Sequence, residues 1–372
     1  SDDIRVLAHL QDFNFSSGKK VAVKVMSKAE MTVQDVELQR REIEILKMCQ
    51  HPNIIRLLDI FENQGGVLFA HGFDALRKGR YQVREFEQAC ASKFGAKHAL
   101  AVTSGTAALV VALKALGVKP GDEVITQAFT FVAAVESILA IGAVPVIVNI
   151  DESLNMDPLA LEEKINIKTK VIMPVHMLGM PADMSAIKNI ANKYNLKIVE
   201  DNCEAIGATL GNDYLGTIGD IGVMSFDHGK ALTTGEGGML LSHSKGLDEI
   251  AREYHDHGHQ NNPTLPRGRD TKRLVGFNYR MTEIQAAIGK VQLRKLDRLL
   301  VENAKRYDAV DALLSSKFQQ RKKIKGSVGQ KDCYIFRVPL REEREKIIEL
   351  LFEKGFGTKN LPDAVEWHCA YY

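Results

Sequence analysis

The stretch "HALAVTSGTAALVVALKAL" (98–116) carries the pattern that sets the fold class. Residues 98–103 form a short apolar run typical of a buried strand, and residues 104–116 form a longer run of helical length that opens on Ser-Gly-Thr. The same succession recurs downstream. Further strands are predicted at 122–126, 144–150, 170–176, 196–201 and 221–226. Strands separated by helices predict an α/β fold in which helices cover both faces of a mainly parallel sheet.

Three parts follow one another along the chain. Residues 1–64 differ in character from the rest, residues 65–297 form the large α/β domain, and residues 298–372 form a smaller α+β domain that we expect to be truncated. One long helix, predicted at 282–314, leaves the large domain toward the small one. The basic stretch at 319–326 is predicted to be an exposed loop.

The composition excludes several classes of partner. The 372 residues are 45% hydrophobic and 26% charged, with a formal net charge of +2, so nothing indicates nucleic-acid binding. No apolar run reaches the ~18–20 residues that span a bilayer, and no membrane partner is expected. The five cysteines include no CxxC pair. This usage predicts reduced thiols, no metal site and a cytoplasmic protein.

A turn rich in small residues follows the strand at 98–103. "TSGTAAL" (103–109) places hydroxyls and a glycine where a helix begins. Free backbone N–H groups at a helix N-terminus bind phosphate, and glycine allows the anion to approach. The alternative is a purely structural cap, because Ser and Thr are common N-cap residues.

Acidic residues follow the strand at 196–201. "IVEDNCEAIGA" (198–208) carries Glu200 and Asp201, with Glu204 three residues on. One interpretation is a helix N-cap. The other is that Asp201 faces a cationic ring nitrogen, holds a proton on it and so keeps the ring a good electron sink.

A single lysine stands in the glycine-rich stretch "SFDHGKALTTGEGGM" (225–239). A lysine amine becomes nucleophilic when partial burial and cationic neighbours lower its pKa. It then condenses with an aldehyde. Ser225 and the Ser104–Ala107 turn are candidate anchors for a phosphate on that aldehyde. The order GxxxxGK[ST] is absent, because Lys230 precedes the glycines, so ATP is not the expected ligand.

Taken in order, these features resemble a known family. A phosphate turn, a ring-facing aromatic, a carboxylate, a serine five residues before a lysine and a GEGG turn resemble the aspartate-aminotransferase-like (type I) fold, which uses pyridoxal 5'-phosphate (PLP). More narrowly, residues 80–372 resemble the DegT/DnrJ/EryC1/StrS family of sugar aminotransferases. The matching motifs are "SGTAALVVAL", "GDEVITQAFTFVAAVESILAIGAVPVIVNID", "PVHMLGMPADM", "VEDNCEAIGA", "SFDHGKALTTGEGGML" and "GFNYRMTEIQAAIG".

The resemblance implies a role for each matching residue. Lys230 would attach the cofactor covalently and later carry a proton, Asp201 would pair with the pyridinium nitrogen, and Phe131 would stack on the ring. Asn278 would reach the phosphate of the neighbouring subunit's cofactor, which implies a homodimer. The phosphate itself would be held by Ser104, Gly105, Thr106, Ala107 and Ser225.

Other positions leave alternatives open. Glu204 stands where many family members carry Gln near the O3' atom of the cofactor, which puts the hydrogen bonding there in doubt. His176 would line the site or be a satisfied core histidine. His255, His257 and His259 have the spacing of a loop metal site, but the resemblance places His257 and His259 on the substrate side.

The resemblance implies an enzyme that transfers an amino group, with glutamate as the expected donor, to a keto-sugar. Some relatives carry histidine in place of the lysine and act as dehydratases, so Lys230 favours transamination. "HGHQNNP" (257–263) and "LPDAVEWHCAYY" (361–372) look most like the Kdo 8-aminotransferase type. The acceptor would be 8-oxo-Kdo or a nucleotide-linked keto-sugar, as in lipopolysaccharide biosynthesis. The alternative is a fused or degraded, non-catalytic protein that keeps the fold.

The first part of the chain resembles a different family. "VAVKVM" with Lys24, "REIEIL" with Glu42 and "HPNIIRLLDIFEN" are similar to the N-lobe of a Ser/Thr protein kinase. In a complete kinase such a lysine and glutamate pair to position ATP. The sequence has no GxGxxGxV loop before Lys24 and no HRD or DFG motif. We therefore expect an incomplete fragment without kinase activity.

Overall fold

The computed structural model describes residues 81–358 except Pro263 and Pro266, together with the backbone of four strands in the first 80 residues. The chain forms two compact units that divide between Tyr81 and Gln82. This division falls later than the expected boundary at 64/65, because the strand Gly66–Gly72 (β4) pairs with strands on both sides of it. Glu42 and the motif at 361–372 lie outside the described residues.

The first unit contains a four-stranded antiparallel sheet of order β1-β2-β4-β3. The kinase-like motif that contains Lys24 lies in β2, and the motif "HPNIIRLLDIFEN" contains β3. The strands are β1 (Phe13–Asn14), β2 (Lys20–Ser27), β3 (Arg56–Glu62) and β4 (Gly66–Gly72).

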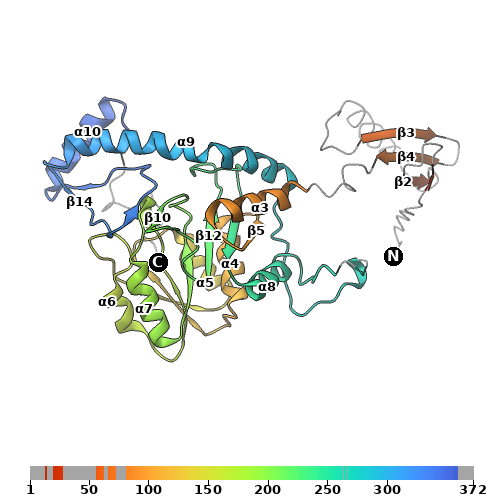
Figure 1. The fold of residues 1–372 in the computed structure, drawn as a ribbon, viewed down its shortest axis with the longest axis horizontal. Coiled ribbons are helices and arrows are strands. Elements are labelled where there is room, and N and C mark those ends of the chain that lie inside the picture. The colour runs from red at the N-terminus through yellow and green to blue at the C-terminus, as the bar shows by residue number, and fades with distance from the viewer. Residues whose placement is uncertain are drawn as a thin grey trace. The chain divides into compact units, whose positions relative to one another are not determined.

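The second unit is built on a seven-stranded sheet of order β5-β13-β12-β9-β8-β6-β7 (Figure 1). All six predicted strands are present, and their pairing is parallel except around β13, which is antiparallel to both neighbours. The strands are β5 (His98–Val102), β6 (Glu123–Gln127), β7 (Val144–Val148), β8 (Thr169–Met173), β9 (Lys197–Asp201), β12 (Ile221–Ser225) and β13 (Gly238–Ser242).

Helices cover both faces of this sheet, as predicted. They are α3 (Gln82–Phe94), α4 (Gly105–Ala115), α5 (Val132–Ala140), α6 (Pro158–Lys164), α7 (Met184–Tyr194), α8 (Lys245–His255), α9 (Glu283–Leu314) and α10 (Arg341–Glu353). Alternate strand residues enter different cores, since side chains alternate across a strand. Leu100 packs with α4, α5 and α8, whereas its neighbour Ala101 packs with α3 and α9. Likewise Val171 joins the first core and Ile172 joins a third, with α6 and α7.

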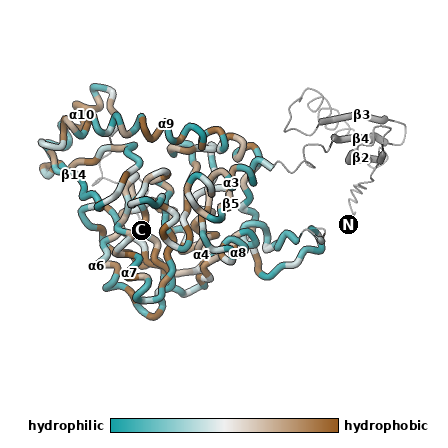
Figure 2. The backbone as a smooth tube through the Cα atoms, viewed as in Figure 1, coloured by the Kyte–Doolittle hydropathy of each residue, from teal (hydrophilic) through white to brown (hydrophobic). Residues whose placement is uncertain are grey.

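The long helix predicted at 282–314 is α9. Thr282 and Gln285 form a capping box at its start, which satisfies free N–H groups there. Polar and apolar stretches alternate along it (Figure 2). The expected boundary at 297/298 falls inside α9, and residues beyond the helix belong to the same compact unit.

The segment after α9 returns to the large sheet domain. Short strand β15 (Ser327–Val328) pairs with β10 (Thr209–Leu210), which also pairs with β11 (Asp213–Tyr214). Strands β14 (Gln319–Gln320) and β16 (Phe336–Arg337) pair with each other. Within the described part of the chain, no helix has both the length and the apolar character that a membrane crossing requires.

Gly222 in β12 offers a test of this packing. A Cβ built there would lie 1.9 Å from the carbonyl oxygen of Gly216, so Gly222→Ala must displace backbone. We expect a loss of about 2–4 kcal/mol in the free energy of unfolding, measured by chemical denaturation. Gly268→Ala is the matched control, because a Cβ there meets no atom within 4 Å. Equal stability of the two variants would contradict the packing described.

Candidate active site

Strands β9, β12 and β5 end at one edge of the sheet, where β13 begins, and bring the predicted residues together. Asp201 ends β9 and is paired in register with Val223 of β12. Ser225 ends β12 and pairs with Gly238, which in turn pairs with Val102 of β5. The turn that begins at Ser104 therefore lies beside the ends of β9 and β12, as expected for a ligand site in a parallel sheet.

The Ser104 turn forms an anion-binding cradle. Ser104 caps α4, with its Oγ accepting from the amide of Ala107 at 3.0 Å. The Gly105 and Thr106 amides donate to no acceptor within residues 81–358, so they are free to bind an anion. The N–H of Ala107, which was predicted to bind the phosphate, already donates to Oγ of Ser104. A phosphate would have to compete with Ser104 for it.

Gly105 is required by the close approach of this turn to β12. A Cβ at Gly105 would lie 2.8 Å from the Cβ of Ser225 and 3.2 Å from the Sγ of Cys203. Ser225 is buried, and its Oγ would lie 3.1 Å from a Cβ on Gly105, the first residue of the helix. The two amides and this hydroxyl fit the phosphate of PLP.

Asp201 is a buried carboxyl group with few protein partners. Its Oδ1 accepts from the amide of Cys203 at 3.1 Å, and 6% of the residue is exposed. Burial raises the pKa of Asp201; hydrogen bonds from the thiol and the amide of Cys203 oppose this, the charge of Glu204 adds to it and that of Lys230 opposes it. A buried carboxylate of this kind is stabilised by a cationic partner, which suits the pyridinium nitrogen of PLP.

Lys230 lies in the loop between β12 and β13 and faces a carboxylate. Its Nζ is 3.8 Å from Oε1 of Glu204, and a quarter of its side chain (25%) is exposed. The other Glu204 oxygen, Oε2, accepts from the amide of Leu178 at 3.1 Å. The lysine side chain is thus partly exposed, and Glu204 lies beside its amine.

Glu200, next to Asp201, has a structural role. It accepts hydrogen bonds from His176 at 3.0 Å and from the amides of Gly216 at 2.9 Å and Ile218 at 2.6 Å. Burial alone would raise the pKa of Glu200, but these hydrogen bonds lower it. Adjacent carboxylates therefore have opposite environments on the two faces of β9.

Of the two alternatives left open for His176, its surroundings favour the satisfied core histidine. Its Nε2 bonds Glu200, and its Nδ1 accepts from the amide of Ala182 at 3.1 Å. The side chain is fully buried even without a ligand. Neither ring nitrogen is left for a substrate.

Phe131 and Asn278 are exposed near this edge. Phe131 is the N-cap residue of α5 and is 47% exposed. The segment that carries Asn278 lies beside the end of β5, where the carbonyl of Tyr279 accepts from the amide of Thr103 at 3.0 Å. The side chain of Asn278 is exposed.

The three histidines after Tyr254 lie in different environments. His255 ends α8, His257 is exposed with φ +54°, and Nδ1 of His259 lies 3.3 Å from a carboxylate oxygen of Asp270. Among the described residues, no group of three or more His, Cys, Asp or Glu side chains is arranged to hold a metal.

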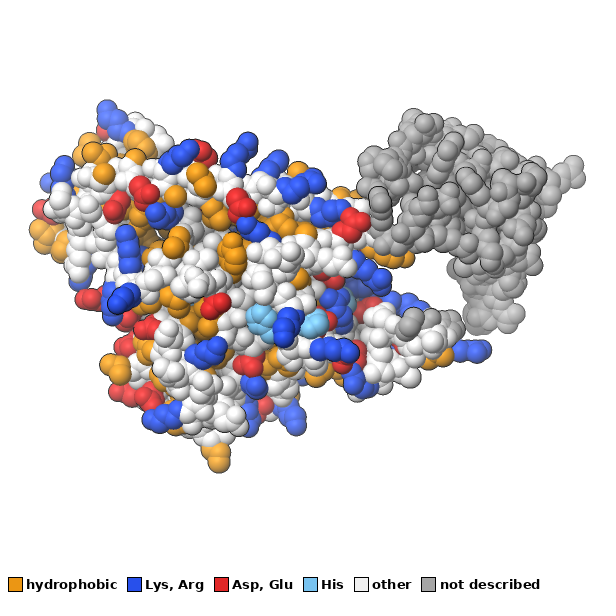
Figure 3. Space-filling view, viewed as in Figure 1, with side chains coloured by type: hydrophobic (Ala, Val, Ile, Leu, Met, Phe, Trp, Pro, Cys, Tyr) orange, Lys and Arg blue, Asp and Glu red, His pale blue; other side chains and the backbone are white. Residues whose placement is uncertain are grey.

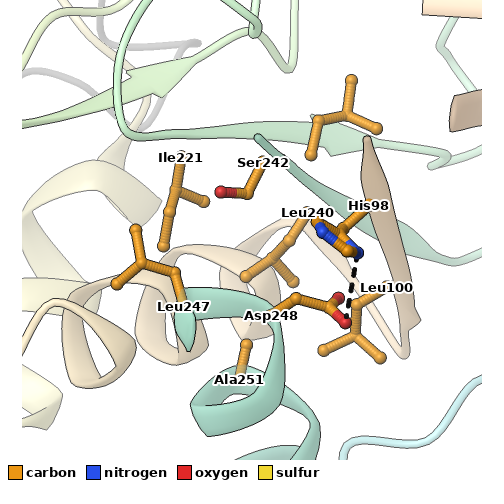
Figure 4. A pocket seen from close by; sticks show the side chains of 9 residues that line it. His98, Leu100, Ile221, Leu240, Ser242, Leu247, Asp248 and Ala251 are labelled. Atoms are coloured by element: carbon orange, nitrogen blue, oxygen red, sulfur yellow. Dashed lines mark ion pairs between the residues drawn. The ribbon is translucent and has the colours of Figure 1, made fainter. Parts of the chain in front are cut away.

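A small cavity lies at the opposite end of the sheet (Figure 4). Its volume of about 10 Å³ accommodates little more than one water molecule. His98 and Asp248 approach to 3.8 Å on its wall. The cavity therefore has no part in the site around Lys230.

Sequence reasoning missed two residues close to the site. Cys203, one of the free cysteines among the described residues, has its Sγ beside Gly105; its position two residues after Asp201 was the only signal. Arg321 was predicted to lie in an exposed loop, but it is 9% exposed and bonds carbonyl groups near Leu178. A basic run gives no sign of which member is buried.

The seven-stranded sheet with these residues at its edge is the aspartate-aminotransferase-like fold. The solved PLP form of the putative sugar aminotransferase Spr1654 from Streptococcus pneumoniae aligns with a TM-score of 0.66 and 29% identity over 76% of this chain and 78% of that one.

Curated relatives agree with this class. The chain is 44% identical to GDP-perosamine synthase of Caulobacter vibrioides over 60% of this chain and 58% of that protein. It is 36% identical to GDP-perosamine synthase of Escherichia coli O157:H7 over 76% of each.

The model of the DegT/DnrJ/EryC1/StrS aminotransferase family matches residues 70–371. The chain belongs to this family. A protein kinase domain model also matches, at residues 10–101, in agreement with the resemblance of the first part of the sequence.

The raised pKa of Asp201 predicts a pH-dependent effect of Asp201→Asn. The pKa of an aspartate in the unfolded chain is about 3.9. Because the pKa of Asp201 is higher than this in the folded chain, protonated Asp201 contributes its full stabilisation below that pH. The contribution is lost as the pH rises through the folded-state pKa. Asparagine cannot ionise. In the cofactor-free chain, we expect Asp201→Asn to melt at or above the wild-type temperature at pH 7.5, with the difference shrinking toward pH 4.

The control is Asp213→Asn, which changes an exposed carboxylate and should give equal melting temperatures at both pH values. If Asp201→Asn melted below the wild type at pH 7.5 and matched it at pH 4, the burial argument would be refuted.

Proposed function

We propose that this protein is a PLP-dependent aminotransferase that acts on a keto-sugar. The observation that carries the proposal is the placement of a partly exposed amine, Lys230, beside a buried acid, Asp201, and the cradle at Ser104 and Ser225. An amine, an acid for the ring nitrogen and a phosphate cradle are what binding of PLP requires.

Each residue of this set would have one task. Bound PLP supplies an electron sink for the carbon that exchanges its amino group. The amides of Gly105 and Thr106, with Ser104 and Ser225, hold its phosphate, and Asp201 keeps a proton on its ring nitrogen. Phe131 stacks on the ring. Lys230 holds the cofactor and moves a proton at its Nζ, and Glu204 lies near the ring oxygen.

For the acceptor we propose a nucleotide-linked keto-sugar, with glutamate as donor. Support comes from the two GDP-perosamine synthases, whose names refer to nucleotide-linked amino sugars. We propose His257 and His259 as substrate-side residues. The sequence "HGHQNNP" supports the other acceptor, 8-oxo-Kdo, and a use in lipopolysaccharide biosynthesis.

The function is tested by adding PLP to the cofactor-free chain. We expect a visible absorbance band that glutamate removes, and its absence in Lys230→Ala, because the band requires this amine. Lys197→Ala, which removes an exposed lysine paired with Asp220, is the control and should keep the band. Amino sugars formed from a panel of keto-sugars are then identified by mass spectrometry.

The outcomes separate the alternatives. A band that glutamate leaves unchanged supports the non-catalytic protein. An 8-amino product only from 8-oxo-Kdo rejects the nucleotide-linked acceptor. Phosphate transfer from ATP that survives Lys230→Ala but not Lys24→Ala would show a kinase instead.

We further propose a homodimer in which Asn278 reaches the partner's cofactor. The support is an apolar stripe on α9 formed by Ile284, Ile288 and Val291, which are 75%, 43% and 40% exposed. Their spacing puts them on one helix face. Phe277, beside Asn278, is also 53% exposed. Apolar side chains lie among charged ones on the visible face in Figure 3.

The dimer prediction is tested with Ile288→Glu. Burying a charge in the interface should weaken the dimer by about tenfold or more, as measured by light scattering over a concentration series. Leu313→Glu, at an exposed position (68%) near the other end of α9, should leave association unchanged. A monomeric wild type, or equal association of both variants, would reject this interface.

A further inference from the structure

Arg321 is a buried arginine that binds only main-chain oxygens. Its Nε donates to the carbonyl of Ser153 at 2.9 Å, and its Nη1 donates to those of Met177 at 3.0 Å and Leu178 at 3.4 Å. Within residues 81–358 no carboxylate pairs with it. Burial lowers the pKa of Arg321 to about 10, so the guanidinium remains charged at neutral pH. Burying a charge without a carboxylate partner costs free energy of folding. The hydrogen bonds of Arg321 to main-chain carbonyls therefore compensate for that cost.

The turn that Arg321 binds has an unfavourable backbone conformation. Leu178 has φ 54° and ψ 46°, the left-handed region that bulky residues avoid. Such a conformation persists only where the surroundings hold it. Here the carbonyl of Leu178 accepts from Arg321 and from the thiol of Cys333 at 3.7 Å.

The amide of the same residue points into the candidate active site. It donates to Oε2 of Glu204 at 3.1 Å, and Oε1 of Glu204 lies 3.8 Å from Nζ of Lys230. One residue, Leu178, thus holds Arg321 on its carbonyl side and Glu204 on its amide side.

We propose that Arg321 is a positioning residue for Lys230, acting through the strained turn at Leu178 and the carboxylate of Glu204. The inference rests on the proposed function in taking Lys230 as the reacting amine. It assigns to Glu204 the task of holding the lysine in place before the cofactor binds. It also links the chain after α9 to the reactive amine.

The proposal predicts how Lys230 reacts in the full-length, cofactor-free chain. An amine held against a carboxylate is a poorer nucleophile than a free one. We expect Arg321→Met, which keeps an apolar stem but removes the donors, to speed acetylation of Lys230 by acetic anhydride about two- to five-fold, as loss of a partly exposed ion pair would. Labelling is measured by peptide mass spectrometry relative to Lys197.

Three further variants make the test specific. Glu204→Gln keeps an acceptor for the Leu178 amide but removes the charge, so it should give the same acceleration. Lys230 in the double variant Arg321→Met/Glu204→Gln should be acetylated no faster than in Glu204→Gln alone. Both changes interrupt the same path from Arg321 through Leu178 and Glu204 to Lys230. Lys322→Gln, which changes the exposed neighbour of Arg321, should leave the rate unchanged.

The proposal would be overturned if Lys230 in folded Arg321→Met were acetylated at the wild-type rate. It would also be overturned if the acceleration in the double variant equalled the product of the two single accelerations. If Arg321→Met does not fold, Arg321→Lys replaces the planar fork by one ammonium and must still label faster than the wild type; a wild-type rate there overturns it too. Labelling requires no PLP, so the result is separate from whether the chain is an aminotransferase.

Discussion

The geometry of the site depends on two glycines, which let the turn after β5 approach the ends of β12 and β13 closely. Gly105 faces Ser225, and Gly238 faces the carbonyl oxygen of Ser104, from which a Cβ on Gly238 would lie only 2.3 Å. With these two glycines, the turn after β5 rests directly on the ends of β12 and β13. The first free amides of α4 then lie beside Ser225 and within the same edge as Asp201. A side chain at either glycine would push the cradle away from the carboxylate.

The chemistry at this edge depends on the different environments of two neighbouring carboxylates. Glu200 receives hydrogen bonds from His176 and from several amides, and it therefore ties β9 to the turn after β11. Asp201 receives one backbone hydrogen bond and is left buried next to the site. A cationic ring nitrogen would stabilise Asp201 and would add nothing to Glu200. Alternation along β9 thus selects which acid faces the cofactor.

Much of this arrangement could be predicted from the sequence. The apolar runs located six strands of the sheet, and the long helical pattern at 282–314 located α9. Strand β13 was missed because it is antiparallel and follows β12 through the glycine-rich turn, without the intervening helix on which the strand–helix pattern relies. The sequence left open whether His176 is a core residue and did not indicate the burial of Arg321, since both depend on contacts with residues distant in sequence, such as Glu200 and Ser153. Sequence motifs named the residues near Lys230 individually. The distances between them became known only from the folded structure.

The account depends most on whether the amine of Lys230 becomes joined to the aldehyde of PLP. Borohydride reduction of the PLP-treated, full-length chain, followed by peptide mass spectrometry, tests this directly. The account predicts a reduced pyridoxyl-phosphate adduct on Lys230 in nearly every molecule and none on Lys197. A fully unmodified Lys230, or adducts spread over surface lysines, would contradict it.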